Sequence, residues 1–217
     1  MKITRRAFCQ GTAAFGAAAL LTSFAADFAF MRPAFAQAPS PADLMQAGPL
    51  GDMALGAENA PVTIIEYASM TCPHCADFHA TTYVELKKRY IDTGKVRFIF
   101  REFPLDQLAL AGFLLARCVG PDKYFPMIDT LFQLQKEWVV QKPLGPLLAI
   151  AKQAGLSEQQ FNDCLQDKKL IDGLEDVRQR AIKLNVQSTP SFFINGKPAR
   201  VFRIEEFEKA LAPYLKG

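Results

Sequence analysis

Residues 37–217 of this chain have no net charge. The 217 residues contain 25 Lys and Arg against 22 Asp and Glu, but residues 1–36 carry an excess of three positive charges, and the remainder is balanced. The longest basic cluster is Lys87-Lys88-Arg89. A protein that binds nucleic acid presents a basic patch or stripe, so the composition argues against that class and no nucleic-acid partner is expected.

The sequence also lacks a long hydrophobic run. Its charge-free apolar stretch covers residues 11–26, shorter than the roughly 20 residues of a membrane-spanning helix. With the basic residues before it and Ala34-Phe35-Ala36 after it, residues 1–36 predict an export signal cleaved near Ala36. Thr4-Arg5-Arg6-Ala7-Phe8 is similar to the twin-arginine signal of bacterial proteins exported in the folded state. The general secretory route is the alternative, and either route predicts a periplasmic protein.

Cysteine is scarce and odd in number. Of the five cysteines, Cys9 lies in the expected signal, which leaves Cys72, Cys75, Cys118 and Cys164. In an oxidising compartment disulfides persist, so these four can form two pairs.

Strands and a helix are expected in the first half of the remaining chain. Residues 37–59 are rich in proline and predict a flexible lead-in. Residues 62–67 and 96–100 are β-branched and aromatic runs, typical of buried strands, and residues 72–90 follow a helical period between them. A strand, helix and strand in this order form a right-handed parallel unit.

A helical block, a hairpin and a last helix follow. Asn195-Gly196 predicts a hairpin turn between strands at 191–194 and 199–202, and residues 205–214 predict an amphipathic helix. The order predicts an α/β fold, a mixed sheet flanked by helices with an inserted α-helical subdomain over 105–184. The helices expected in that subdomain are 106–119, 123–136, 144–154, 157–167 and 170–184.

Cys72-Pro73-His74-Cys75 follows a strand and opens a helix. Unpaired backbone N–H groups and the partial positive charge of a helix N-terminus stabilise a thiolate there, so Cys72 is expected to be the exposed nucleophile. Pro73 suits the first helical position, and His74 adds a donor and, when protonated, a positive charge. Cys75 lies one turn deeper, where it can resolve a mixed disulfide formed at Cys72.

A Cys-x-x-Cys pair has other interpretations. Haem attachment would need histidine at the position of Ala76, and a purely structural bond would close a very small, strained loop. A metal site remains an alternative because His79 follows Cys75 by one helical turn. Its ligands would be Cys72, Cys75, His79 and Cys118 or Cys164. The leading interpretation is a redox pair that needs no metal and no cofactor.

Four segments together resemble the DsbA family of periplasmic disulfide oxidants within the thioredoxin fold. They are residues 60–67, 72–75, 101–105 and 188–196, and the resemblance runs from about Leu55 to Lys216. It implies a thioredoxin-like domain made of residues 60–104 and 185–217, interrupted by the helical insertion.

The resemblance also implies roles for single residues. Pro190 is expected to be a cis-proline facing the cysteines, with the Thr189 backbone pairing with an extended substrate chain; an ordinary trans-proline at an edge strand is the alternative. Glu66 matches a buried acidic residue beneath the cysteines. It is expected either to shuttle protons for Cys75 or to pair with a base such as Arg101.

Cys118 and Cys164 are expected to form a second, structural disulfide within the helical block, with two separate buried thiols as the alternative. His79 is interpreted as a helix-surface residue or a local hydrogen-bonding residue, and Trp138 as core.

The function that follows is a periplasmic thiol:disulfide oxidoreductase that introduces disulfides into exported proteins with free cysteines. The resemblance implies reoxidation by a quinone-linked, DsbB-like membrane protein. A reductase or isomerase with the same chemistry is the alternative, although isomerases of this fold add a dimerisation domain for which residues 37–61 are too short, so a monomer is expected. A metal-binding module and a redox-inactive chaperone are alternatives of another class.

Overall fold

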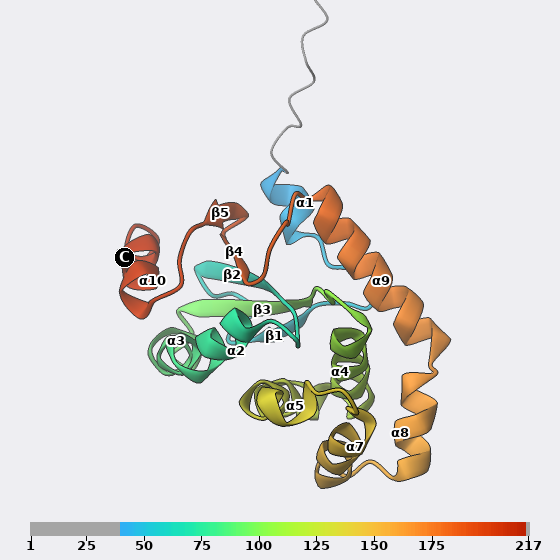
Figure 1. The fold of residues 1–217 in the computed structure, drawn as a ribbon. Coiled ribbons are helices and arrows are strands. Elements are labelled where there is room, and N and C mark those ends of the chain that lie inside the picture. The colour runs from blue at the N-terminus through green and yellow to red at the C-terminus, as the bar shows by residue number, and fades with distance from the viewer. Residues whose placement is uncertain (1–39, 216–217) are drawn as a thin grey trace, which may run out of the picture. The chain divides into compact units, whose positions relative to one another are not determined.

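The computed structural model describes residues 40–215 and is built around a five-stranded mixed sheet (Figure 1). The strand order is β1-β3-β2-β4-β5; β2 and β3 are parallel, and the other neighbours are antiparallel. The strands are β1 (Met53–Leu55), β2 (Val62–Ala68), β3 (Val96–Glu102), β4 (Ser191–Ile194) and β5 (Lys197–Ala199).

The two parallel strands are buried on both faces, as their uninterrupted apolar runs predict. In their register Glu66 lies opposite Phe100, and Tyr67 lies opposite Arg101. Because successive side chains of a strand point to opposite faces, Glu66 and Arg101 face different layers of the molecule.

Helices cover both faces of the sheet (Figure 1). One face packs on a small cluster that includes Leu44 of α1 (Pro41–Met45) and Ala181 of α9 (Lys168–Lys183). The larger core on the other face is covered by helices that include α2 (Pro73–Ala80), α3 (Thr82–Leu86) and α10 (Ile204–Leu211). This arrangement confirms the predicted mixed sheet flanked by helices.

The segment expected to be a flexible lead-in contains a short helix and a strand, so the expectation is wrong at residues 41–45 and 53–55. Ser40 caps α1 with its hydroxyl, which accepts from the Asp43 N–H at 3.1 Å, and Pro41 occupies the first turn. Strand β1 then pairs with β3. The prolines indicated a loop, yet proline is also favoured at the first position of a helix.

The helix expected over 72–90 is broken at Thr81, where the backbone leaves helical geometry. The Thr81 hydroxyl donates to the Asp77 carbonyl at 2.7 Å, a bond that competes with the helical ladder. The chain continues as α3 and as a π-helical segment, η1 (Lys87–Ile91).

Six helices lie between β3 and β4, where an insertion was expected. They are α4 (Gln107–Cys118), α5 (Pro121–Gln133), α6 (Gln135–Trp138), α7 (Leu144–Gln153), α8 (Glu158–Leu165) and α9. The helix expected over 123–136 begins at Pro121 instead and is divided after Gln133.

The hairpin follows its turn residues closely. Asn195 and Gly196 both have positive φ, 48° and 74°, as a two-residue turn between antiparallel strands requires. Such a turn returns the chain at once, so β5 begins at Lys197 rather than at the expected residue 199.

Candidate active site

Cys72 is the residue that caps the N-terminus of α2. Its backbone is extended, Pro73 follows in the first turn, and the Cys75 N–H donates to Cys72 Sγ at 3.3 Å. Cys72 was expected to be exposed, but only 5 % of its surface is, so that expectation is wrong. The Thr189 carbonyl lies 3.3 Å from Cys72 Sγ and covers it from the other side.

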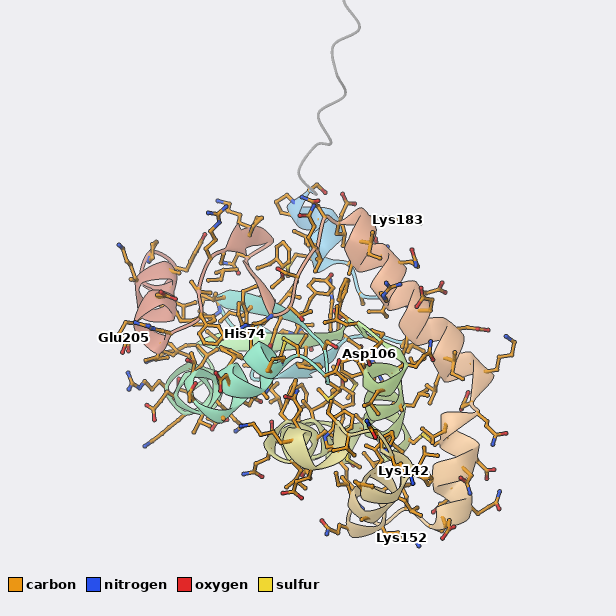
Figure 2. All side chains as sticks on the ribbon, viewed as in Figure 1. His74, Asp106, Lys142, Lys152, Lys183 and Glu205 are labelled. Carbon is orange, nitrogen blue, oxygen red and sulfur yellow. A yellow bond between two sulfur atoms is a disulfide. The ribbon has the colours of Figure 1, made fainter. Side chains whose placement is uncertain are left out.

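The surroundings of Cys72 favour its thiolate. A hydrogen bond from the Cys75 thiol lowers the pKa of Cys72 most. The Thr189 side chain and the backbone N–H groups of Cys75 and His74 lower it further, while burial raises it. Together they outweigh burial and lower the pKa of Cys72 to about 5. The side chain of His74 is exposed at the start of α2 (Figure 2), and His74 lowers the pKa of Cys72 through its backbone N–H.

Cys75 has the opposite character. It is fully buried, and burial, together with the charges of Cys72 and Glu66, raises the pKa of its thiol far above the ordinary value. The pair therefore combines a sulfur that is readily ionised with one that stays protonated.

The Thr189-Pro190 peptide bond is cis and brings the Thr189 carbonyl beside Cys72. Residues separated by more than a hundred positions in the sequence thus meet at the start of α2.

Glu66 lies in the core and forms a pair with His79. Its Oε2 is 2.9 Å from His79 Nε2, while its Oε1 is buried without a hydrogen-bond partner. Burial raises the pKa of Glu66. Although burial alone would lower the pKa of His79, the carboxylates of Glu66 and Asp129 raise it to about 9. A proton is therefore held between Glu66 and His79 at neutral pH.

For Glu66 and for His79, the structure excludes one of the two alternatives that the sequence left open. Glu66 does not pair with Arg101, because the two side chains leave the sheet on opposite faces. Arg101 instead contacts Asp52 with two nitrogens, at 2.9 and 3.0 Å, and donates to the Tyr67 hydroxyl at 2.8 Å. Of the two alternatives for His79, the helix surface is excluded, since only 6 % of it is exposed, and the local hydrogen bond is found, with Glu66.

Side chains outside the motif hold the loop that leads to Cys72. The buried amide of Gln135 donates to the carbonyls of Met70 and Cys72 at 2.8 and 3.0 Å. The Thr71 hydroxyl donates to Asp106 at 2.8 Å, and Asp106 also caps α4, where Figure 2 marks it. The sequence did not predict these contacts, because no pattern in it relates Gln135 or Asp106 to the loop before Cys72.

Cys118 and Cys164 are joined in a disulfide, with Cα atoms 6.2 Å apart, which links α4 to α8. Trp138 is fully buried.

Within residues 40–215, no group of three or more acidic, histidine or cysteine side chains is arranged to hold a metal ion, and no helix is long and apolar enough to cross a membrane. The export signal expected over 1–36 lies outside the described residues.

Comparison with known proteins gives consistent matches. The model of the thioredoxin family matches residues 50–212. The crystal structure of α-DsbA1 from Wolbachia pipientis superposes with a TM-score of 0.74 at 33 % identity, over 81 % of this chain and 96 % of that one. The structural likeness confirms the thioredoxin-like fold.

Two relatives by sequence carry names of the same chemistry. A Rickettsia bellii protein, named as a protein-disulfide oxidoreductase, is 34 % identical over 74 % of this chain and 63 % of its own length. A Bacillus anthracis protein, named as disulfide bond formation protein D, is 32 % identical over 75 % of this chain and 77 % of its own. The chain spans about three fifths of the length of the Rickettsia relatives that it matches.

Proposed function

We propose, since this chain belongs to the DsbA-like group of the thioredoxin family, that it is a thiol:disulfide oxidoreductase acting through Cys72 and Cys75. The observation that carries the proposal is the contrast within the pair: the pKa of Cys72 is lowered to about 5, and that of Cys75 is raised. Only a thiolate attacks a disulfide, and a low thiol pKa makes a good leaving group, so Cys72 exchanges with substrates.

In the oxidising direction, a substrate thiolate attacks Cys72 Sγ of the Cys72–Cys75 disulfide. A bond forms between the substrate sulfur and Cys72, the bond between the two cysteines breaks, and its electron pair leaves on Cys75, which takes up a proton. A second substrate thiolate then attacks the substrate sulfur of this mixed disulfide and expels Cys72 as a thiolate. The substrate has lost two electrons, and the enzyme holds them as one thiolate and one thiol.

Thr189 and Pro190 serve substrate binding in this proposal. The cis bond turns the chain so that Thr189 lies against Cys72, with its carbonyl 3.3 Å from the sulfur. An extended substrate chain beside Cys72 can hydrogen-bond to the Thr189 backbone, as strands do when a peptide adds to a sheet edge.

The same contrast favours an oxidant over a reductase or isomerase. Every donor to the Cys72 thiolate stabilises the reduced protein, because the disulfide form has no thiolate to stabilise. The larger this stabilisation, the more strongly the disulfide form draws electrons from other thiols.

The setting we propose is the periplasm, reached through a twin-arginine signal over residues 1–36. The substrates are exported proteins with free cysteines, and a quinone-linked, DsbB-like membrane protein reoxidises the pair. We further propose that Cys118–Cys164 is a structural bond, that the protein acts as a monomer, and that it uses no cofactor or metal.

The test is the equilibrium of the Cys72–Cys75 pair with glutathione buffers of graded composition, followed by trapping of free thiols and mass spectrometry. We expect a pair more oxidising than that of thioredoxin. A Cys118→Ala/Cys164→Ala variant assigns the measured transition to Cys72 and Cys75. A potential as low as that of thioredoxin would exclude the oxidant role, and stoichiometric zinc on the reduced protein would exclude the redox role in favour of a metal site.

A further inference from the structure

A groove on the surface of the molecule reaches the buried His79. It has a volume of about 500 Å³ and lies where α2, α3 and α5 meet. Its walls include Ala76, His79, Tyr83, Val84, Asp129 and Phe132. None of the residues that line it is Cys72, Thr189 or Pro190, so a substrate chain at the cysteines leaves the groove open.

His79 connects this groove with the core beneath the cysteines. On one side, its Nε2 lies 2.9 Å from Glu66 Oε2. On the other side, its Nδ1 is buried without a hydrogen-bond partner, and the half-exposed carboxylate of Asp129 is 3.8 Å away. The rings of Phe132 and Tyr83, with centroids 4.4 and 4.5 Å from that of His79, fix the imidazole between the two carboxylates.

Glu66 contacts His79, which lies one turn after Cys75 on the same face of α2. Burial raises the pKa of the Cys75 thiol and the charge of Glu66 raises it further, while Glu66 Oε1 is buried with no partner of its own. Glu66 therefore presents one oxygen to His79 and keeps the other available. Cys75, Glu66, His79 and Asp129 thus form a series of ionisable groups that begins in the core and ends in the groove.

We propose that His79 relays protons between Glu66 and the groove, so that Cys75 gains and loses its proton on a surface that the substrate does not cover. An imidazole can accept a proton at one nitrogen while it releases one from the other, and the two nitrogens of His79 face the two ends of this path. The inference rests on the proposed function, since it concerns the proton of the buried thiol.

The proton balance of each direction defines the role of the relay. When the Cys72–Cys75 disulfide is opened, the electron pair on Cys75 takes a proton from the Glu66–His79 pair, and the pair regains one through Nδ1 from the groove. When Cys75 attacks a mixed disulfide at Cys72, its proton passes to Glu66 and leaves through His79. His79 acts through Glu66 and does not touch the reacting sulfurs.

The charged and titratable groups around His79 are few. Glu66 faces it from β2, Asp129 from α5 and Tyr83 from α3, and the Tyr83 hydroxyl is buried without a partner. Further along the groove, Lys87 and Asp92 pair with each other at 2.6 Å. The base on the solvent side of His79 is therefore Asp129.

The experiment separates the step that uses Cys72 from the step that uses Cys75. The reduced full-length protein is mixed rapidly with oxidised glutathione, quenched with acid and analysed by mass spectrometry. The mixed disulfide forms by attack of the Cys72 thiolate, and it is resolved when the Cys75 thiol loses its proton and attacks. We expect His79→Gln, whose amide can still donate to Glu66, to slow resolution by about 100-fold, the low end for a positioned proton-transfer group, and to leave formation unchanged.

Chemical rescue gives a second measurement. His79→Ala enlarges the groove beside Glu66, so added imidazole should enter and restore resolution in a concentration-dependent manner. Val84→Ala is the matched control, because Val84 lines the same groove and is not among the groups that hold His79; its resolution should not respond to imidazole. Asp129→Asn should slow resolution less than His79→Gln, since solvent can replace an exposed base.

Resolution at the unchanged rate in His79→Gln would overturn the relay, and so would slow resolution in His79→Ala that imidazole does not restore. If His79→Ala fails to fold, His79→Gln decides alone. If the unaltered protein forms no mixed disulfide, the proposed function fails. If it forms and resolves one normally while the variants match it, the relay alone fails.

Discussion

The two cysteine pairs of this protein differ in their spacing along the chain and in the hydrogen-bond donors around their sulfurs. Cys72 and Cys75 are three residues apart at the N-terminus of one helix, and hydrogen-bond donors converge on the first sulfur. Cys118 and Cys164 are 46 residues apart and join two helices of the inserted block. Cys164 belongs to the same main core as Cys72 and Cys75, and Cys118 packs against it, so the two pairs differ in their donors and their spacing rather than in burial.

The difference teaches that position decides what a sulfur does. Donors at a helix end stabilise a thiolate and make one pair reactive, whereas a bond across a long loop restricts the unfolded chain and makes the other pair structural. The first pair should therefore control exchange with little effect on stability, and the second should control stability with little effect on exchange.

The largest effect should come from removing the reactive sulfur. Cys72→Ser should abolish the oxidation of a reduced dithiol peptide, because no other described sulfur is placed to accept the first attack. With oxidised glutathione, Cys75→Ser should instead accumulate a mixed disulfide between Cys72 and glutathione: the Cys72 thiolate breaks the glutathione disulfide and releases one glutathione thiol, and no resolving sulfur is left. Both results can be read by thiol trapping and mass spectrometry.

The matched control is Cys118→Ala/Cys164→Ala, which should oxidise the peptide at the unchanged rate. A Cys72→Ser protein that still oxidises the peptide would contradict the division of roles between the pairs.

The second prediction concerns stability. Opening a loop of this length should lower the free energy of unfolding of Cys118→Ala/Cys164→Ala by about 4 kcal/mol, as the chain-entropy model gives for 46 residues. Urea denaturation of the oxidised proteins measures it. A loss below about 1 kcal/mol would mean that the two helices are held by packing alone and that the second pair is not a staple.

Much of this contrast could be predicted from local sequence. A strand, a helix and a strand around Cys72 form a periodic pattern with strong turn signals, and Asn195-Gly196 specifies its turn by backbone geometry. The start of α2 at Cys72 follows from proline in its first turn. Signals of this kind act between residues that are close in the chain.

The features of the site that could not be predicted from the sequence depend on contacts between residues far apart in the chain. The alternative that pairs Glu66 with Arg101 is wrong because strand register and face, which send Arg101 to Asp52, are set by the whole sheet. The burial of Cys72 depends on Thr189, and the loop before it depends on Gln135. None of these contacts follows from spacing or periodicity.

The third prediction concerns how the free energy of unfolding depends on pH. Of the two pairs, only Cys72 and Cys75 can contribute to this dependence, because the sulfurs of the Cys118–Cys164 disulfide do not titrate. In the reduced protein the pKa of Cys72 is about 5 in the folded state, against 9.0 for an ordinary thiol. A lowered pKa contributes stability that is complete above the unfolded value and is lost as the pH falls through the folded one. At pH 7 the contribution should be about 3 kcal/mol, and at pH 4 it should vanish.

The measurement is the free energy of unfolding of the reduced protein minus that of Cys72→Ala, from pH 4 to pH 9, with the second disulfide intact. The difference cancels the other titrating groups, and it should rise with pH through this range. A flat difference would mean that the donors around Cys72 do not stabilise a thiolate.

The smallest effect should come from the contact that ties the two regions together. The side-chain amide of Gln135, in the helical block, donates to two backbone carbonyls in the loop that leads to the redox cysteines, those of Met70 and Cys72. Gln135→Leu fills the same space and leaves these buried acceptors short of donors, which should cost about 1–3 kcal/mol of unfolding free energy.

Because Gln135 fixes the backbone of Cys72, peptide oxidation by Gln135→Leu should also slow, by about three- to tenfold. Gln133→Leu, an exposed position two residues earlier, is the matched control and should change neither quantity. If Gln135→Leu lost stability and kept its full rate, the helical block would support the redox loop without positioning it. The two cysteine pairs would then have fully separate roles, because the contact that joins their regions would affect stability and not the rate of exchange.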